Sequence, residues 1–168
     1  MKKRVLVTAA NGMGPYIIEA FQAAGYEVFA IARNSSRKQS ALARNDLPAD
    51  HILTYDLASD EALTDKFWQK IIADYKIDGV VNNAMVTPKN SVTKPGDKDQ
   101  IRTYRVNTKM PTALFEACAA SGTPVIQQSA NRAHIPNDKG DAYRLSKKPC
   151  ADRIAEIRQG KKAQGRCR

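Results

Sequence analysis

The sequence predicts an α/β domain with a doubly wound parallel sheet. Two observations carry this prediction: short apolar runs recur along the chain, and segments with helical spacing of apolar residues separate them. Strands that alternate with helices imply right-handed crossovers and a parallel sheet covered on both faces. The sequence shows no internal repeat and no linker, so we predict one domain over residues 1–158 and a short tail over 159–168.

Five short runs rich in Val, Ile or other apolar residues are predicted to form the strands. In chain order they are residues 4–9, 26–32, 51–56, 77–84 and 124–130.

The first helix is predicted between the first two strands. Ile17, Phe21 and Ala24 fall at positions i, i+4 and i+7, and Gly25 is placed to end the helix. The next helix is predicted to begin at Ser59 as its N-cap. Its apolar face comprises Leu63, Phe67, Ile71 and Tyr75.

Two further helices are predicted later in the chain, over residues 98–121 and 141–159. They complete an alternating pattern of strands and helices that fits a single core, because a chain of 168 residues suffices to bury one.

The composition predicts a protein of the cytoplasm. Apolar residues make up 42% of the chain, but no apolar run approaches the roughly 18 residues that a membrane span needs. The N-terminal "MKKRVLVTAA" is too short for a signal peptide, and the three cysteines lack metal-ligand spacing. We therefore expect a reducing compartment, no membrane partner and no metal site.

The net charge of +10 is concentrated at one end of the chain. Residues 153–168 hold six basic residues and one acidic residue, which is half of the excess. No aromatic residue interleaves them to stack on bases, so the pattern argues against nucleic acid as a partner. We predict a basic, disordered tail over 159–168, with a polyanion site as the alternative.

A glycine-bearing turn follows the first predicted strand, in "VTAANGMGPY". Such a turn, placed between a strand and a helix N-terminus, lets backbone N–H groups meet a pyrophosphate, whose charge the helix dipole favours. A plain strand–helix turn is the alternative, since short glycine motifs also occur without a ligand.

From this turn onward the chain resembles the short-chain dehydrogenase/reductase superfamily, including its epimerase/dehydratase branch. That family shows T-G-x-x-G-x-x-G at the turn. Thr8 and Gly12 fit this pattern, whereas Ala9 replaces the first glycine and Pro15 the third, with Gly14 one place early.

Further segments match the family in the right order. "TYDLAS" (54–59), "NNAM" (82–85), "YRVNTKMP" (104–111), "VIQQSA" (125–130) and "YRLSK" (143–147) resemble its conserved segments. Together with the turn, they cover residues 4 to about 157. The resemblance implies a Rossmann-like fold, and cofactor contacts from Thr8, Ala10, Asn11, Gly12, Met13, Gly14, Asp56, Leu57, Asn83, Ala84, Tyr143 and Lys147.

The resemblance also implies a catalytic set of Asn107, Ser129, Tyr143 and Lys147. Tyr143 and Lys147 are four residues apart on one helix face, and an ammonium near a phenol lowers the phenol pKa. Ser129 would bind the substrate oxygen. Pro111 frees the main-chain carbonyl of Asn107, which could hold a water against Lys147, while a kink that only serves packing is the alternative.

The cofactor choice depends on the end of the second strand, "IARNSSRK". An acidic residue there would select NAD, but this segment carries Arg33, Arg37 and Lys38 and no carboxylate. A guanidinium suits a 2′-phosphate, so we predict NADP(H), with Arg33 as its ligand and NAD(H) as the alternative cofactor. A solvated basic loop remains the non-functional interpretation.

The predicted activity is therefore an NADP(H)-dependent oxidoreductase or epimerase-like enzyme acting on a small carbonyl or hydroxyl substrate. The resemblance leaves a sugar-nucleotide-like substrate and a homo-oligomer open. It ends where the family's substrate-binding region would begin, so a shortened relative is the alternative, a dinucleotide-binding module without turnover.

Overall fold

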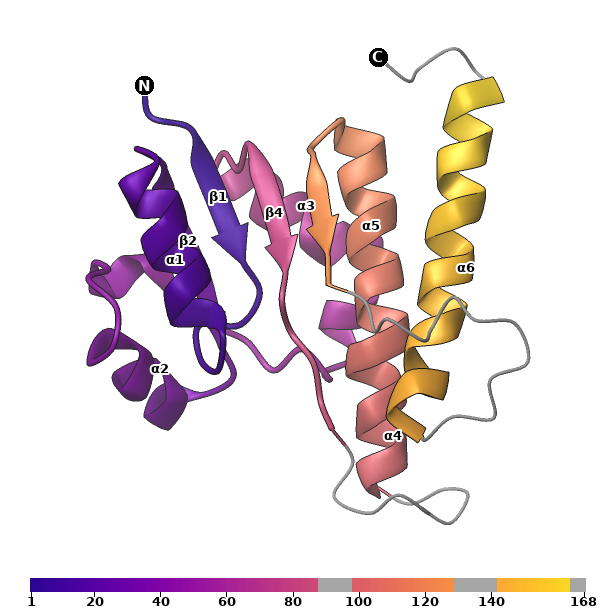
Figure 1. The fold of residues 1–168 in the computed structure, drawn as a ribbon, viewed down its shortest axis with the longest axis horizontal. Coiled ribbons are helices and arrows are strands. Elements are labelled where there is room, and N and C mark those ends of the chain that lie inside the picture. The colour runs from indigo at the N-terminus through magenta and orange to yellow at the C-terminus, as the bar shows by residue number, and fades with distance from the viewer. Residues whose placement is uncertain (88–97, 129–141, 164–168) are drawn as a thin grey trace.

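The computed structural model describes residues 1–87, 98–128 and 142–163. Five parallel strands form one sheet in the order β3-β2-β1-β4-β5, which confirms the predicted doubly wound fold (Figure 1). The strands are β1 (Arg4–Val7), β2 (Glu27–Ala32), β3 (Ile52–Thr54), β4 (Gly79–Asn82) and β5 (Val125–Gln127). The strand order reverses between β1 and β4, and a ligand site is expected where the carboxyl ends of these strands diverge.

Helices cover both faces of the sheet. α1 (Gly14–Ala23) and α2 (Ser35–Leu42) lie on one face, and α3 (Asp65–Asp74) and α5 (Met110–Ser121) lie on the other. α4 (Lys98–Tyr104) leads into α5 through a π-helical turn (Arg105–Lys109). α6 (Ala142–Ala163) runs alongside α5 (Figure 1).

The alternation of side chains along each strand divides the core in two. In β1, Leu6 points toward the face of α3 and α5, whereas Val5 and Val7 point toward α1 and α2. All three are buried, which explains why the strand is a continuous apolar run rather than an alternating one.

β1, β3, β4 and β5 end two or three residues earlier than predicted, whereas β2 ends at Ala32 as predicted. β1 ends at Val7; the next amide, of Thr8, donates to Val81, but that of Ala10 donates to Ile31 on the neighbouring strand β2. The backbone after β1 therefore changes its hydrogen-bond partner from β4 to β2 within three residues.

The prediction that Ser59 caps a long helix was wrong. Ser59 instead accepts from the amide of Ala62 and precedes a 3₁₀ turn (Glu61–Leu63). α3 begins after Thr64, whose hydroxyl oxygen accepts from the amide of Phe67. Two hydroxyl residues so close together compete as N-caps, and apolar spacing does not distinguish them.

Three other helical segments differ from the prediction. α2 was missed, although Asn34 caps it by accepting from the amide of Arg37 at 3.0 Å. The helix predicted over 98–121 contains the π-helical turn, which ends two residues before Pro111. α6 continues to Ala163, past Gln159, where the sequence predicts the tail to begin. Residues 164–168 lie outside the described part of the chain.

Candidate functional site

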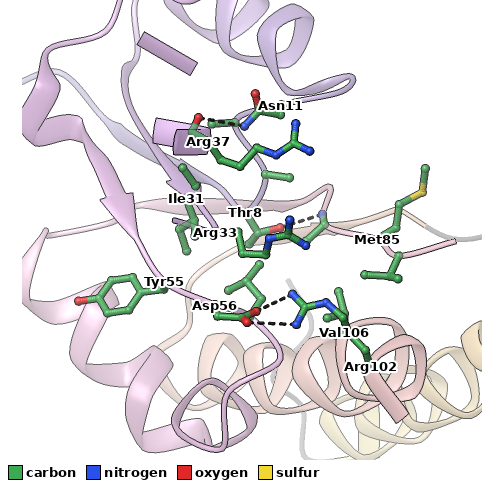
Figure 2. Close-up of a pocket in the computed structure, with 16 residues that line it drawn as sticks. Thr8, Asn11, Ile31, Arg33, Arg37, Tyr55, Asp56, Met85, Arg102 and Val106 are labelled. Atoms are coloured by element: carbon green, nitrogen blue, oxygen red, sulfur yellow. Dashed lines mark hydrogen bonds and ion pairs between the residues drawn. The ribbon is translucent and has the colours of Figure 1, made fainter. Parts of the chain in front are cut away.

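A pocket of about 210 Å³ opens at the carboxyl ends of the strands, beside the turn after β1. Segments from β1, β2, β3, β4 and α4 meet there (Figure 2). Its lining includes seven residues predicted from the sequence: Thr8, Ala10, Asn11, Arg33, Asp56, Leu57 and Ala84. The site therefore assembles residues that are up to 98 positions apart in the chain, from Thr8 to Val106.

The turn after β1 leads directly into the N-terminus of α1, and two of its glycines have distinct structural roles. Gly12 has φ +68°, a left-handed conformation that favours glycine. Gly14 begins α1, and a Cβ added there would lie 2.0 Å from the carbonyl oxygen of Ala9. Gly14 thus permits the close contact between helix and turn, and Pro15, which needs no amide partner, occupies the first turn of α1.

Thr8 links this turn to the end of β4. Its hydroxyl donates to Oδ1 of Asn82 at 2.6 Å and accepts from the amides of Asn83 and Ala84 at 3.1 and 3.0 Å. Asn82 in turn donates to Gln127 on β5 at 2.8 Å. Thr8 and Asn82 are almost fully buried, so these bonds replace water and fix the sheet end that carries the pocket.

The side chain of Asn83 contacts the backbone of the turn after β1. Its side-chain amide donates to the carbonyl of Ala9 at 3.4 Å, and it is not among the pocket-lining residues. Gly12, Met13 and Gly14 also lie outside the lining. Of these four residues predicted to bind cofactor, the structure places Asn83 and Gly14 in the packing that shapes the turn.

Asn107 lies in the π-helical turn and is fully buried. Its side-chain amide forms two hydrogen bonds with the backbone of Val86: Oδ1 accepts from the amide at 2.9 Å, and Nδ2 donates to the carbonyl at 2.8 Å. Val86 lines the pocket, so Asn107 positions one wall of it.

Arg33 and Arg37 line the pocket on the side of β2 and α2 (Figure 2). Both arginines are exposed. α2 begins between them, at Ser35, after its N-cap Asn34. The carbonyl of Arg37 accepts from the Asn11 side chain at 3.3 Å, which ties α2 to the glycine turn. Cationic side chains and a helix N-terminus together favour an anionic group at this position.

Asp56 and Arg102 form an ion pair on the opposite side of the pocket (Figure 2). The guanidinium of Arg102 donates to both carboxylate oxygens, at 2.7 and 3.1 Å. These hydrogen bonds hold the pKa of Asp56 below its usual value, against the opposing effect of burial. No sequence spacing connects Arg102 with Asp56, and the sequence analysis missed Arg102 for that reason.

Lys147 lies on α6 and is 3% exposed. Burial lowers the pKa of its ammonium group. α6 packs against the π-helical turn that carries Asn107, so two of the predicted catalytic residues belong to adjoining elements. Tyr143 lies one turn before Lys147 on α6, its side chain outside the description. Ser129 also lies outside the described residues.

We also searched the described residues for a metal site and for a membrane-spanning helix. Within 1–87, 98–128 and 142–163 there is no group of three or more His, Cys, Asp or Glu side chains that could hold a metal ion. Among the same residues, no helix is long and apolar enough to cross a membrane.

Known proteins are similar to this chain over almost its whole length. The sequence model of the family described as short chain dehydrogenase matches residues 3–158. L-xylulose reductase of Caenorhabditis elegans is 26% identical over 152 residues, which is 86% of this chain. The chain spans 60% of the length of this curated relative.

Solved structures share the fold at lower sequence identity. A metagenomic short-chain oxidoreductase in complex with NADP is 22% identical, with a TM-score of 0.71 over 96% of this chain and 77% of its own. The Bordetella bronchiseptica enzyme WbmH in complex with NAD+ is 20% identical, with a TM-score of 0.69 over 94% of this chain and 53% of its own.

Proposed function

The chain belongs to the short-chain dehydrogenase family, and from this premise we propose that it is an NADP(H)-dependent oxidoreductase. It would transfer hydride between nicotinamide and the carbonyl or hydroxyl group of a small substrate. The observation that carries the proposal is the pocket at the carboxyl ends of the strands, which holds the chemical groups expected for a phosphorylated nucleotide.

Charge favours NADP(H) over NAD(H). Three arginines and one aspartate line the pocket, and the aspartate is paired with one of the arginines. Arg33 and Arg37 therefore contribute a net positive charge beside the N-terminus of α2. A 2′-phosphate gains charge-assisted hydrogen bonds there, whereas the ribose hydroxyls of NAD(H) lack the matching carboxylate at the end of β2.

The turn after β1 would hold the pyrophosphate. Gly12 gives the backbone its left-handed bend, and Gly14 brings the start of α1 close to the turn. The dipole of α1 then acts on the phosphate charge at short range. Pro15 carries no amide hydrogen, so the contacts from this helix start would come from the residues before it.

α6 and the π-helical turn would supply the catalytic groups. The nicotinamide, when bound, supplies or accepts the hydride. The Tyr143 hydroxyl would give its proton to the substrate oxygen, or take it, and Ser129 would orient that oxygen. Lys147 would stabilise the phenolate and bind the nicotinamide ribose. Its burial keeps the ammonium out of bulk water, where its effect on a neighbouring phenol pKa would be screened.

A dinucleotide-binding protein without turnover is the second candidate. Ala9 and Pro15 replace two glycines of the family's turn. These replacements would affect the cofactor turn more than the fold, since buried apolar residues pack on both faces of β1 and β2.

A two-stage experiment tests the proposal. NADPH and NADH are titrated against the protein by following nicotinamide fluorescence, and a panel of carbonyl substrates is then screened with the tighter cofactor. The panel includes ketose sugars, such as the substrate that gives the C. elegans relative its name, and nucleotide sugars. Binding with turnover supports the enzyme, binding alone supports the second candidate, and absence of binding contradicts both.

A further inference from the structure

Met85 follows β4 and brings a sulfur atom to the margin of the pocket (Figure 2). The residue is 48% exposed, so small molecules in solution can reach it. Among the described residues that line the pocket, it is the one with a thioether, a polarisable group that peroxides oxidise. The proposed hydride transfer does not use this group.

The backbone is fixed on both sides of Met85. The amides of the two preceding residues donate to the Thr8 hydroxyl at 3.1 and 3.0 Å. Both backbone groups of Val86, the next residue, are hydrogen-bonded to the side chain of Asn107. A chemical change in the Met85 side chain is therefore accommodated by its own rotatable bonds or by the ligand, and not by a shift of the backbone.

The place of Met85 in the sheet puts it beside the path of a dinucleotide. The strand order reverses between β1 and β4, and a dinucleotide binds across the crevice at the carboxyl ends of such strands. The pocket holds about 210 Å³, less than the roughly 300–1,000 Å³ of typical ligand sites. A dinucleotide that fills the pocket would extend past its margin and cover the exposed part of Met85.

We propose that Met85 is an oxidation site, and that its oxidation state sets the affinity of the pocket for the dinucleotide. This inference rests on the proposed function, because the regulated step is cofactor binding at the same site. The sulfur attacks one oxygen of a peroxide, so an S–O bond forms and the O–O bond breaks. The proton of the attacked oxygen passes to the departing hydroxide, which leaves as water. Sulfur is oxidised to the sulfoxide and the peroxide is reduced.

The sulfoxide weakens binding because its oxygen is polar and must keep a hydrogen-bond donor. Water supplies the donor when the pocket is empty, and a ligand that covers the oxygen removes that water. Ala84 and Val86, its neighbours in the lining, carry no side-chain donor. Their amides already donate to Thr8 and Asn107. The same geometry means that a bound dinucleotide shields the sulfur from peroxide.

The test combines peptide mass analysis with cofactor titration. The protein is treated with hydrogen peroxide, catalase removes the peroxide, and dithiothreitol reverses the oxidation of cysteines. We expect oxidation of Met85 to raise the dissociation constant for NADPH about tenfold, as for one buried polar group without a partner. Methionine sulfoxide reductase should restore the starting value.

Two other methionines calibrate the treatment. Met1 is fully exposed and should be oxidised whether or not cofactor is present, whereas Met110 is buried and should stay reduced. NADP+ added during the treatment should slow oxidation at Met85 but not at Met1.

Variants assign the effect to one residue, and each is compared with itself before and after peroxide. Met85→Leu removes the sulfur and should keep its NADPH affinity through the treatment. Met13→Leu removes an exposed methionine outside the pocket lining and should still lose about tenfold in affinity. Met85→Gln carries a polar group permanently and should bind NADPH about as weakly as the oxidised protein; it carries the test if Met85→Leu does not fold.

The outcomes distinguish this inference from the function on which it rests. If NADPH binds the untreated protein but Met85 resists oxidation, or is oxidised without a change in the dissociation constant, the inference alone is overturned. A loss of affinity that Met85→Leu shares, or that Met13→Leu prevents, overturns it equally. If NADPH does not bind the untreated protein, the proposed function fails and the inference fails with it.

Discussion

The side chain of Asn107 pairs with both backbone groups of Val86, accepting at 2.9 Å and donating at 2.8 Å. This joins the π-helical turn before α5 to the segment after β4, so a predicted catalytic residue holds the pocket wall in place. The sequence analysis concerned its main-chain carbonyl, whereas this clamp uses its side chain. The two uses do not exclude each other, and they predict different consequences of substitution.

Asn107→Leu should destabilise the fold as well as reduce activity. The change leaves the amide and carbonyl of Val86 without their partner in a partly buried place, which costs about 2–4 kcal/mol. Urea unfolding should show this loss. Asn11→Ala is the control, because the Asn11 side chain makes one exposed hydrogen bond of 3.3 Å and its loss should cost much less. Equal losses in the two variants would contradict the clamp.

Thr8→Val should weaken the sheet end that carries the pocket. The shape is kept, but the Asn83 and Ala84 amides lose their acceptor and Asn82 loses a donor. We expect a loss of about 2–3 kcal/mol in the free energy of unfolding. Thr54→Val, at an exposed position on β3, should stay within about 0.5 kcal/mol of the unmodified protein. Thermal and urea unfolding measure both.

Arg33→Ala should reduce the preference for NADPH over NADH. A hydrogen bond to a charged group contributes about 1.5–3 kcal/mol, so the ratio of dissociation constants should fall by about tenfold or more. Arg44→Ala removes an arginine that lies outside the pocket lining and should leave the ratio unchanged. If the unmodified protein binds both cofactors equally well, the assignment of Arg33 is wrong.

Tyr143→Phe should abolish most turnover on a good substrate while leaving NADPH affinity within about twofold. Only the hydroxyl is lost, and a general acid contributes about 100- to 10,000-fold to rate. Steady-state rates and cofactor titration are measured on the same preparation. Full activity in this variant would remove Tyr143 from the mechanism, and NADPH binding without turnover in the unmodified protein would favour the non-catalytic candidate.

Lys147→Met should stabilise the protein at neutral pH although it removes a proposed catalytic group. Burial lowers the pKa of Lys147 in the folded state below its value of 10.5 in the unfolded chain. The unfolded chain therefore binds more protons in the window below pH 10.5, and the stability of the unmodified protein rises with pH through that window.

The methionine variant lacks this cost, so its advantage should be largest at neutral pH and should shrink as the pH approaches 10.5. Urea unfolding at pH 7 and pH 10 measures the difference. Lys66→Met, at an exposed position, is the control and should show no such trend. A lower stability of Lys147→Met at pH 7 would show that the contacts of the ammonium outweigh its burial.

The order of strands and helices could be predicted from sequence because each strand of a parallel sheet is buried on both faces. Such strands are short apolar runs, and the amphipathic helices between them leave a different period. The predicted starts of helices were less accurate, because several polar residues in the same segment are suitable as N-caps. Ser59 and Thr64 are both suitable N-caps, and no helix was predicted for α2 because its sequence is mostly polar and lacks apolar residues at helical spacing.

Local pattern and motif spacing along the chain were enough to predict the family, the parallel α/β fold and seven of the sixteen residues that line the pocket. The tertiary structure alone decided that Arg102 meets Asp56, that Asn107 clamps Val86 and that Thr8 joins the ends of β1 and β4. These partners are separated by between 21 and 74 residues. Which donor meets which acceptor depends on how the strands pair and the helices pack, and no spacing in the sequence records that geometry.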